Sequence, residues 1–157
     1  GSTKIGDNAF IMAYCHIAHD CKVGNNIIFA NNATLAGHVE IGDFTVVGGL
    51  TPIHQFVRIG EGCMIAGASG VSQDIVPFCL AEGNRAYIRG LNVVGLRRRF
   101  NKVVIDEIHS AFRKLQKAHD IKEIAAQLTN HDCEQVRKMA EFILNTTRGI
   151  PMHKGKQ

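Results

Sequence analysis

One repeat dominates the first half of the chain. From Ile5 to Val76 the sequence divides without a gap into twelve blocks of six residues. Every first position is Ile, Val, Leu or Phe, the second is Gly or Ala in nine blocks, and the fifth is small, β-branched or Cys. Helices repeat every 3.6 residues and strands every two, so a fixed period of six indicates a solenoid of short parallel strands. We expect the first and fifth side chains to point inward.

Composition excludes several other classes of protein. Of the residues, 45% are hydrophobic and 20% charged, and no apolar run is long enough to span a membrane. The N-terminus has no signal-peptide pattern, so a cytosolic location is expected. The five cysteines are odd in number and form no CxxC pair, which predicts reduced and mostly buried thiols (residues 15, 21, 63, 79 and 133).

The sequence changes character after Val76, where the blocks stop. We expect three parts: a β-solenoid over 1–80, an irregular basic connector over 81–100 and a small helical domain over 101–157. Residues 102–118 carry a one-sided apolar stripe typical of an amphipathic helix, made of Val104, Ile105, Ile108, Phe112 and Leu115.

Two shorter helices are predicted further along the chain. Asp120 is expected to cap a helix that begins with IKEIAAQL, and Asp132 to cap one over CEQVRKMAEFILNTT, with Gly149 following its end.

The charge also differs between the two halves. Residues 1–84 carry three Lys and Arg against seven Asp and Glu, a net of −4; residues 85–157 carry 15 against seven, a net of +8. An anionic ligand or acidic partner is therefore expected at the C-terminal half.

The six-residue repeat resembles that of the hexapeptide-repeat transferases. This resemblance implies a mainly β fold, a left-handed parallel β-helix in which three blocks form one coil of 18 residues. The twelve blocks would then form four coils, an exception to the usual right-handed crossover. Because the first block begins almost at residue 1, we expect further coils to be missing upstream.

Four of the eight histidines converge under this coil length. Residues 18 apart stack on one another, and His16, His19, His38 and His54 then fall within a few columns of one corner. A single outward histidine is usually solvated surface, but four at one corner indicate a site. His19 and Asp20 are adjacent, so they can cooperate only if the chain bends there.

Longer stretches carry a more specific resemblance. HIAHDCKVGNN, NNATLAGHVEIGDF, GGLTPIHQFVRIG and GNRAYIRGLNVVGLRRRF, in this order, resemble the UDP-N-acetylglucosamine acyltransferases of lipid A biosynthesis over about residues 5–150. The resemblance implies a cytoplasmic homotrimer of the Gram-negative bacterial type, with no cofactor and no metal. Such an enzyme moves a (3R)-3-hydroxyacyl chain from acyl carrier protein to the 3-position of UDP-GlcNAc.

The resemblance also implies the catalytic roles. His19 matches the general base that removes a proton from the attacking hydroxyl, and Asp20 matches the carboxylate that orients the imidazole. Gly37 matches the residue whose backbone N–H stabilises the oxyanion. Cys15 and Cys21 fall at inward fifth positions, which favours core packing over a role as nucleophile.

Further positions match residues that contact the substrates. Those for the sugar and acyl substrate are His16, His38, His54 and Gln55, and those for the nucleotide and its phosphates are Asn92, Arg98 and Arg99. Gly67 matches a position that limits acyl length, and a glycine there would admit a long chain. Arg85 and Val94 depart from the common pattern, where a histidine and an acidic residue are frequent. The acceptor therefore stays open between UDP-GlcNAc and its 3-amino analogue.

Other functions compete with this interpretation. A γ-carbonic anhydrase-like metalloprotein would also bring histidines together on a left-handed β-helix. The later N-acyltransferase of lipid A biosynthesis shares the solenoid and the carrier protein. A non-catalytic scaffold would leave the histidine corner dispensable. Nucleic acid is a poor partner for the basic half, because few aromatic residues accompany its Lys and Arg.

Overall fold

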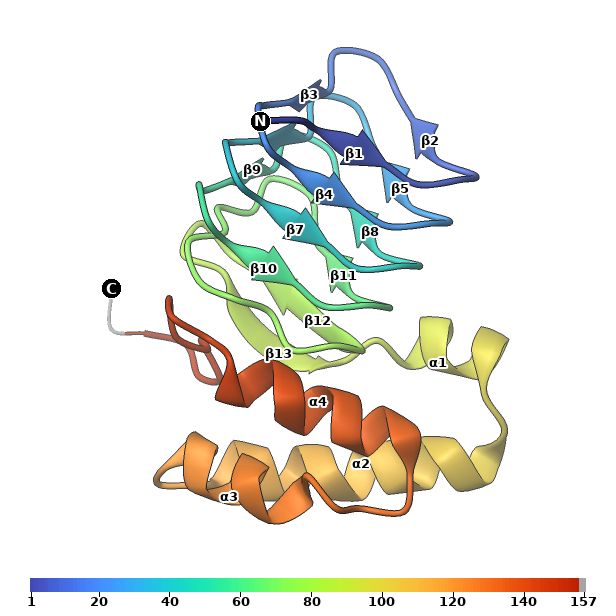
Figure 1. Ribbon diagram of the computed structural model, residues 1–157, viewed down its shortest axis with the longest axis vertical. Helices are drawn as coiled ribbons and strands as arrows, with labels where there is room; N and C mark the ends of the chain where they lie inside the picture. Colours follow the sequence, from blue (N-terminus) through green and yellow to red (C-terminus); the bar gives the residue numbers. More distant parts are fainter. Residues whose placement is uncertain (156–157) are drawn as a thin grey trace.

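The computed structural model of the protein describes residues 1–155 and consists of stacked coils with helices packed at one end (Figure 1). The coils contain eleven two-residue strands, one at the start of each of the first eleven blocks of six: β1 (Lys4–Ile5), β2 (Phe10–Ile11), β3 (His16–Ile17), β4 (Lys22–Val23), β5 (Ile28–Phe29), β6 (Thr34–Leu35), β7 (Glu40–Ile41), β8 (Val46–Val47), β9 (Pro52–Ile53), β10 (Arg58–Ile59) and β11 (Met64–Ile65). The predicted left-handed β-helix is confirmed.

The strands form three parallel sheets along the faces of the solenoid. We call them sheet A (β1-β4-β7-β10), sheet B (β2-β5-β8-β11, extended at its β11 edge) and sheet C (β3-β6-β9). Lys4 pairs with Lys22 and Glu40 with Arg58, so each coil is 18 residues long. Because residues 18 apart lie beside one another, each sheet presents one column of outward side chains.

The inward positions form the core, as predicted from the repeat. Val23, Leu35 and Ile53 are buried, whereas Ile5 and Ile11 remain 46% and 39% exposed at the N-terminal end of the solenoid. Side chains at the fifth position of a block also donate hydrogen bonds inside the solenoid: Cys21 Sγ to Ala36 O, Thr45 Oγ1 to Gly60 O and Thr51 Oγ1 to Ala66 O. These bonds explain why small polar residues are accepted at positions that face the core. All five cysteines are free, and three are fully buried.

The predicted irregular connector is wrong in its local structure. Strands β12 (Cys79–Glu82) and β13 (Tyr87–Leu91) form an antiparallel hairpin, which continues sheet B because β12 pairs with β11. Helix α1 (Val93–Arg99) follows directly. Cys79 and Ala81 are buried, so β12 keeps the inward pattern of the coils after the six-residue spacing has ended.

Three further helices cover the end of the solenoid: α2 (Lys102–Lys117), α3 (Ile121–Leu128) and α4 (Glu134–Leu144). Asp120 caps α3 as predicted. The predicted cap at Asp132 is wrong, because α4 begins after Cys133, whose N–H donates to the His131 imidazole at 3.0 Å. Helix α4 ends at Leu144, five residues before Gly149. Among residues 1–155, none of the helices has the length and apolarity needed to cross a bilayer.

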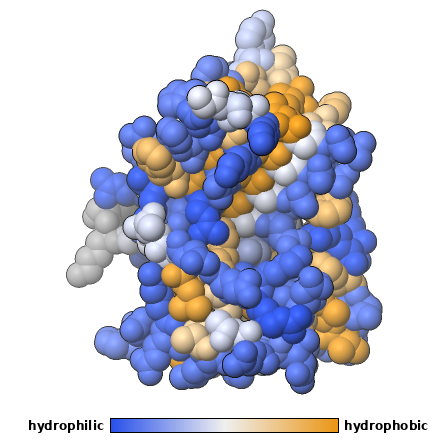
Figure 2. Space-filling view, viewed as in Figure 1, coloured by the Kyte–Doolittle hydropathy of each residue, from blue (hydrophilic) through white to orange (hydrophobic). Residues whose placement is uncertain are grey.

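The three outer faces differ in chemistry. Sheet A carries charged side chains, sheet B carries Phe10, Ile28, Val46 and Met64, and sheet C begins with His16. Figure 2 shows apolar residues gathered at the upper end of the solenoid, where Ile5, Phe10, Ile11, Met12 and Tyr14 are exposed, above a largely hydrophilic lower half. A site that needs polar groups is therefore expected near sheets A and C.

Candidate functional site

His19 and Asp20 lie at the corner between sheets C and A. The strand β3 ends at Ile17, and Asp20 adopts a positive φ of 58°, so the chain bends where the sequence required it. His19 Nδ1 lies 3.0 Å from Asp20 Oδ2. The hydrogen bond from His19 is the main cause that holds the pKa of the Asp20 carboxyl below its usual value. The carboxylate is therefore ionised at neutral pH and accepts a proton-bearing Nδ1.

Gly37 lies directly against the His19 ring in the next coil. A Cβ built on Gly37 would lie 2.6 Å from both His19 Cε1 and Nε2, closer than real side chains approach. The glycine therefore lets the imidazole rest on the backbone, with Nε2 beside the Gly37 peptide. This is the arrangement that a base and an oxyanion donor require.

The Gly37 N–H is free to bind a ligand. At the neighbouring corner, Asn25 Oδ1 accepts the Asp7 N–H and Asp43 Oδ1 accepts the Asn25 N–H, each at 2.7 Å from one coil to the next. Gln55 occupies the equivalent place beyond Gly37, and no acceptor in residues 1–155 bonds the Gly37 N–H. At the Asp7–Asn25–Asp43 corner a side-chain oxygen accepts the backbone N–H of the preceding coil, and the Gly37 N–H at the histidine corner has no such partner among the described residues.

For the acyl transfer that the sequence resemblance predicts, we expect Gly37→Ala to lower kcat about 10²-fold, because the added methyl displaces the His19 ring and crowds the free N–H. Thermal unfolding should change little, since the His19 side chain is 71% exposed and can move away. Steady-state kinetics would measure the effect. Gly90→Ala is the matched control, because its added Cβ meets nothing within 4 Å. An equal kcat in the two variants would contradict the assignment.

His38 completes a cluster with the pair. Its ring is perpendicular to the His19 ring at 5.1 Å between centroids, and its Nε2 lies 3.9 Å from Asp20 Oδ2. Phe56, from the coil beyond, stacks on the His38 ring at 4.6 Å with an interplanar angle of 9°. The sequence reasoning missed Phe56, although it lies 18 residues beyond His38 and therefore in the same column.

The same cluster is the set of potential metal donors in the described range. Donor atoms of His19, Asp20 and His38 lie within 4.8 Å of one another. A γ-carbonic anhydrase-like site would require three imidazoles, whereas this arrangement supplies two and a carboxylate. The His19–Asp20 hydrogen bond is the geometry expected of a base with its orienting group.

The other predicted sugar and acyl positions lie on and beside sheet C. His16 is on β3, and His54 follows β9 two coils away. His54 and Arg85 line one hollow of about 440 Å³, together with the apolar side chains of Ala36, Pro52 and Val71. Gln55 is exposed at the corner beside Phe56. The structure thus places these residues near the His19 cluster but outside it.

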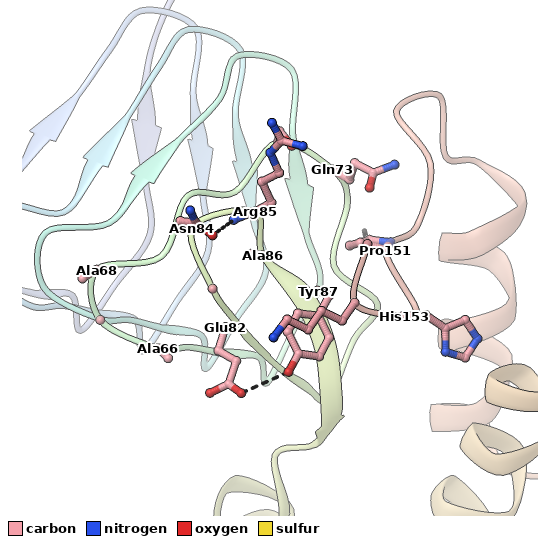
Figure 3. Close-up of a pocket in the computed structure, with 15 residues that line it drawn as sticks. Ala66, Ala68, Gln73, Glu82, Asn84, Arg85, Ala86, Tyr87, Pro151 and His153 are labelled. Atoms are coloured by element: carbon pink, nitrogen blue, oxygen red, sulfur yellow. Dashed lines mark hydrogen bonds between the residues drawn. The ribbon is translucent and has the colours of Figure 1, made fainter. Parts of the chain in front are cut away.

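Gly67 and Arg85 line a second hollow of about 540 Å³, between the β12–β13 turn and the C-terminal segment (Figure 3). Tyr87 donates a hydrogen bond to Glu82 on its wall, and Asn84 accepts the Arg85 N–H. His153 lies on the far side. Arg85 borders both hollows, so it stands where the sheet C face meets the end of the solenoid.

The predicted nucleotide-binding residues belong to α1 and already make contacts within the chain. Asn92 caps α1 and donates to Gly62 O, and Arg98 is exposed. The Arg99 guanidinium pairs with Glu61 at 3.0 Å and lies over the Phe44 ring at 3.9 Å. Lys138 of α4 also pairs with Glu61, at 2.8 Å. Glu61 therefore joins the solenoid to two helices, a contact that no pattern in the sequence predicts.

The Glu61 cluster predicts a change of stability with pH. Burial would raise the pKa of the Glu61 carboxyl, but hydrogen bonds from Lys138 and Arg99 outweigh it and hold the pKa below its ordinary value of 4.5. The stabilisation is then present above pH 4.5 and is lost as the pH falls through the lower, folded-state pKa. Urea unfolding between about pH 6 and pH 3 should show a smaller loss of stability in Glu61→Gln than in the parent. If the free energy of unfolding fell equally with pH in Glu61→Gln and in the parent, this role for Glu61 would be ruled out.

Both halves of the chain are similar to known protein families. Residues 74–151 match the family model described as "Udp N-acetylglucosamine O-acyltransferase; Domain 2", and residues 2–37 match "Bacterial transferase hexapeptide (six repeats)". Two curated relatives are acyl-[acyl-carrier-protein]–UDP-N-acetylglucosamine O-acyltransferases. The one from Campylobacter concisus is 65% identical and that from Campylobacter jejuni serotype O:6 is 71% identical, each over 99% of this chain and 60% of the relative.

A solved structure is also similar. The structure described as UDP-N-acetylglucosamine acyltransferase from Campylobacter jejuni superimposes with a TM-score of 0.93 at 71% sequence identity. The match covers 96% of this chain and 60% of that one. The chain therefore spans about three-fifths of the length of the relatives it matches.

Proposed function

We propose that this chain, which belongs to the UDP-N-acetylglucosamine O-acyltransferase family, carries the reacting groups of an acyltransferase. The reaction moves a (3R)-3-hydroxyacyl chain from acyl carrier protein to the 3-position of UDP-GlcNAc or its 3-amino analogue, the first step of lipid A biosynthesis. The observation that carries the proposal is the His19–Asp20 pair resting against Gly37. We assign this site to the solenoid over 1–80, and the carrier-facing surface to the helical part over 101–157.

His19 acts as the general base. Because Asp20 is an acceptor, it holds the proton on Nδ1 and leaves Nε2 with its lone pair free. Nε2 takes the proton from the sugar hydroxyl or amine as that group attacks the thioester carbonyl. The resulting imidazolium is stabilised by the ionised Asp20 carboxylate beside it.

Gly37 stabilises the tetrahedral intermediate. Its free N–H is adjacent to Nε2, so a carbonyl oxygen placed there becomes an oxyanion within reach of the donor. Collapse of the intermediate re-forms the carbonyl and breaks the carbon–sulfur bond. The leaving thiolate of the carrier takes the proton from His19, which restores the neutral imidazole. No covalent intermediate with the enzyme is required.

The remaining predicted residues bind the substrates. His16, His38, His54 and Gln55 contact the sugar and the acyl thioester, and the apolar hollow beside His54 accepts the acyl chain as it runs toward Gly67. Gly67 borders the far end, where the lack of a side chain admits a long acyl chain, and Arg85 bears on the choice of acceptor sugar. Asn92, Arg98 and Arg99 face the nucleotide, for which Arg98 is the exposed cation.

The partners follow from charge and from the outer faces. The net charge of +8 on residues 85–157 suits an acidic carrier protein. The apolar column of sheet B suits contact with another copy of the chain, and we propose a homotrimer in the cytoplasm. Both proposals can be examined separately, by the salt dependence of carrier binding and by sedimentation.

The test is direct acyl transfer by the intact protein. It is incubated with 3-hydroxyacyl carrier protein and either UDP-GlcNAc or the 3-amino analogue, and the ester or amide product is measured by mass spectrometry. Transfer to at least one acceptor is expected, and the preferred one defines the effect of Arg85 and Val94. Lack of transfer to both, with tightly held stoichiometric zinc at the histidines, would replace the proposal with a metalloprotein.

A further inference from the structure

The cluster of His19, Asp20 and His38 has a second chemistry open to it besides proton transfer. Donor atoms of the three side chains lie within 4.8 Å of one another. Two imidazoles and one carboxylate are ligands that Zn²⁺ accepts, with a water molecule as the fourth ligand of a tetrahedral site. All three side chains are partly exposed, so an ion can enter without any change in the core.

Asp20 Oδ2 lies at the centre of the cluster. It is 3.0 Å from His19 Nδ1 and 3.9 Å from His38 Nε2. Ligand atoms that surround a tetrahedral zinc ion at about 2.1 Å are about 3.4 Å apart. The two observed distances fall on either side of that value, so shifts of about 0.5 Å would give the geometry that zinc requires.

The ligand set is held in place before any ion binds. The His38 ring is stacked on Phe56 at 4.6 Å, and Asp20 is fixed at the corner by its positive φ of 58°. Ligands that are already positioned lose little conformational freedom on binding. The cluster therefore offers more than a chance meeting of surface side chains.

Nearby charges limit the affinity for a divalent ion. Lys4, Lys22 and Arg58 line a hollow of about 600 Å³ beside Asp20 and His38, and Glu40 is a further carboxylate in its lining. The cations oppose the approach of Zn²⁺ through the Coulomb repulsion between like charges. We therefore expect a reversible site that follows the zinc concentration, not a permanently bound metal.

Zinc in this cluster would remove the basic nitrogen of His19. A neutral imidazole carries one proton, and Asp20 keeps it on Nδ1, so Nε2 has the free lone pair. A metal ion at Nδ1 takes the lone pair of that nitrogen, and the single proton of the ring must then be on Nε2. The ring neither gains nor loses a proton, but Nε2 changes from an acceptor into a donor and cannot deprotonate the attacking group.

We propose that the His19–Asp20–His38 cluster is an inhibitory zinc site, with His19 Nδ1, Asp20 Oδ2 and His38 Nε2 as its ligands. The inhibition rests on the proposed function, because it follows from the role of His19 as the base. Zinc and the acceptor sugar then exclude each other at this corner.

Another group of potential metal ligands serves as a comparison. Glu107, His131 and Cys133 line a hollow of about 470 Å³ in the helical part. Both nitrogens of His131 are engaged there, since Nδ1 accepts the Cys133 N–H and Nε2 pairs with Glu107 at 3.3 Å. Zinc binding at these residues would break the contact at the start of α4, so the corner cluster is the preferred site.

The experiment measures the binding of Zn²⁺ to the metal-free intact protein by calorimetry, in the parent and in three variants. His38→Ala should weaken the affinity at least about tenfold, because the loss of a contact outside the ligand shell already costs about 10- to 100-fold. Cys133→Ser and His119→Ala, which remove a thiol and an exposed histidine elsewhere, should keep the parental affinity. Nitrogen NMR should show His19 Nε2 change from unprotonated to protonated when zinc is added.

The transfer assay measures the inhibition. Zn²⁺ should lower the rate, EDTA should restore it, and a rising UDP-sugar concentration should relieve the effect. Mg²⁺ at the same concentration should have none, because it prefers oxygen ligands.

Equal zinc affinity in the parent and His38→Ala would overturn the proposal, and so would a loss of binding in Cys133→Ser or a rate that zinc increases. Calorimetry and NMR require no acyl transfer, so they test the metal site even if the proposed function fails. Transfer that zinc does not affect would remove the inhibitory site and leave the proposed function intact.

Discussion

Replacing His19 with alanine is expected to lower kcat for acyl transfer about 10²- to 10⁴-fold, the usual contribution of a positioned general base. Nε2 is the free acceptor beside Gly37, and no other side chain in residues 1–155 shares that position. The fold should be unaffected, because His19 is an exposed corner residue. Single-turnover transfer with saturating substrates would measure the effect on the chemical step itself.

Two companion variants make this prediction specific. Asp20→Asn should lower kcat less than His19→Ala, because the imidazole remains but loses the partner that fixes its tautomer. His119→Ala, in the turn between α2 and α3, should retain parental kcat. If His19→Ala retained full kcat, the base would have to be another group and the proposed mechanism would fail.

The largest loss of stability is expected from Asp74→Ala. Asp74 is 1% exposed, and its two oxygens accept the Arg58 N–H at 2.8 Å and the Thr146 hydroxyl at 2.6 Å. Alanine leaves both donors unsatisfied in a buried place. Each orphaned group costs about 1–3 kcal/mol, so the free energy of unfolding should fall by about 2–5 kcal/mol. Urea unfolding followed by circular dichroism would measure it.

Thr146→Val and Asp106→Ala provide the comparison. Thr146→Val removes one of the two donors and should cost less than Asp74→Ala, while Asp106→Ala on the exposed face of α2 should be nearly neutral. Asp74→Ala with the unfolding midpoint of the parent would mean that water replaces the lost acceptor, and the contact between solenoid and α4 would then not depend on Asp74.

The sequence predicted the features that depend on the repeat. The coil length, the inward first and fifth positions and the proximity of His19 to Gly37 and His38 all follow from six-residue blocks and residues 18 apart. Phe56 was within reach of the same reasoning, because it falls in the column of Asp20 and His38.

The features that were not predicted depend on contacts between distant segments. Glu61 meets Lys138, a residue 77 positions away, and no local pattern signals that pairing. The Asp132 cap failed because His131 bonds the Cys133 N–H while its other nitrogen pairs with Glu107 of α2. The β12–β13 hairpin was not predicted because the six-residue spacing has ended there. Strand β12 forms through its pairing with β11.

The separation between inward and outward columns has a consequence for how such enzymes diverge. Core positions decide whether a coil stacks, and the outward residue of the same strand takes no part in that decision. His16, Lys22 and Glu40, the exposed residues of their strands, can therefore be exchanged over evolutionary time without first repairing the fold. A lineage can change its acceptor or its acyl donor by substitutions in one column of outward side chains, while the coils keep their shape.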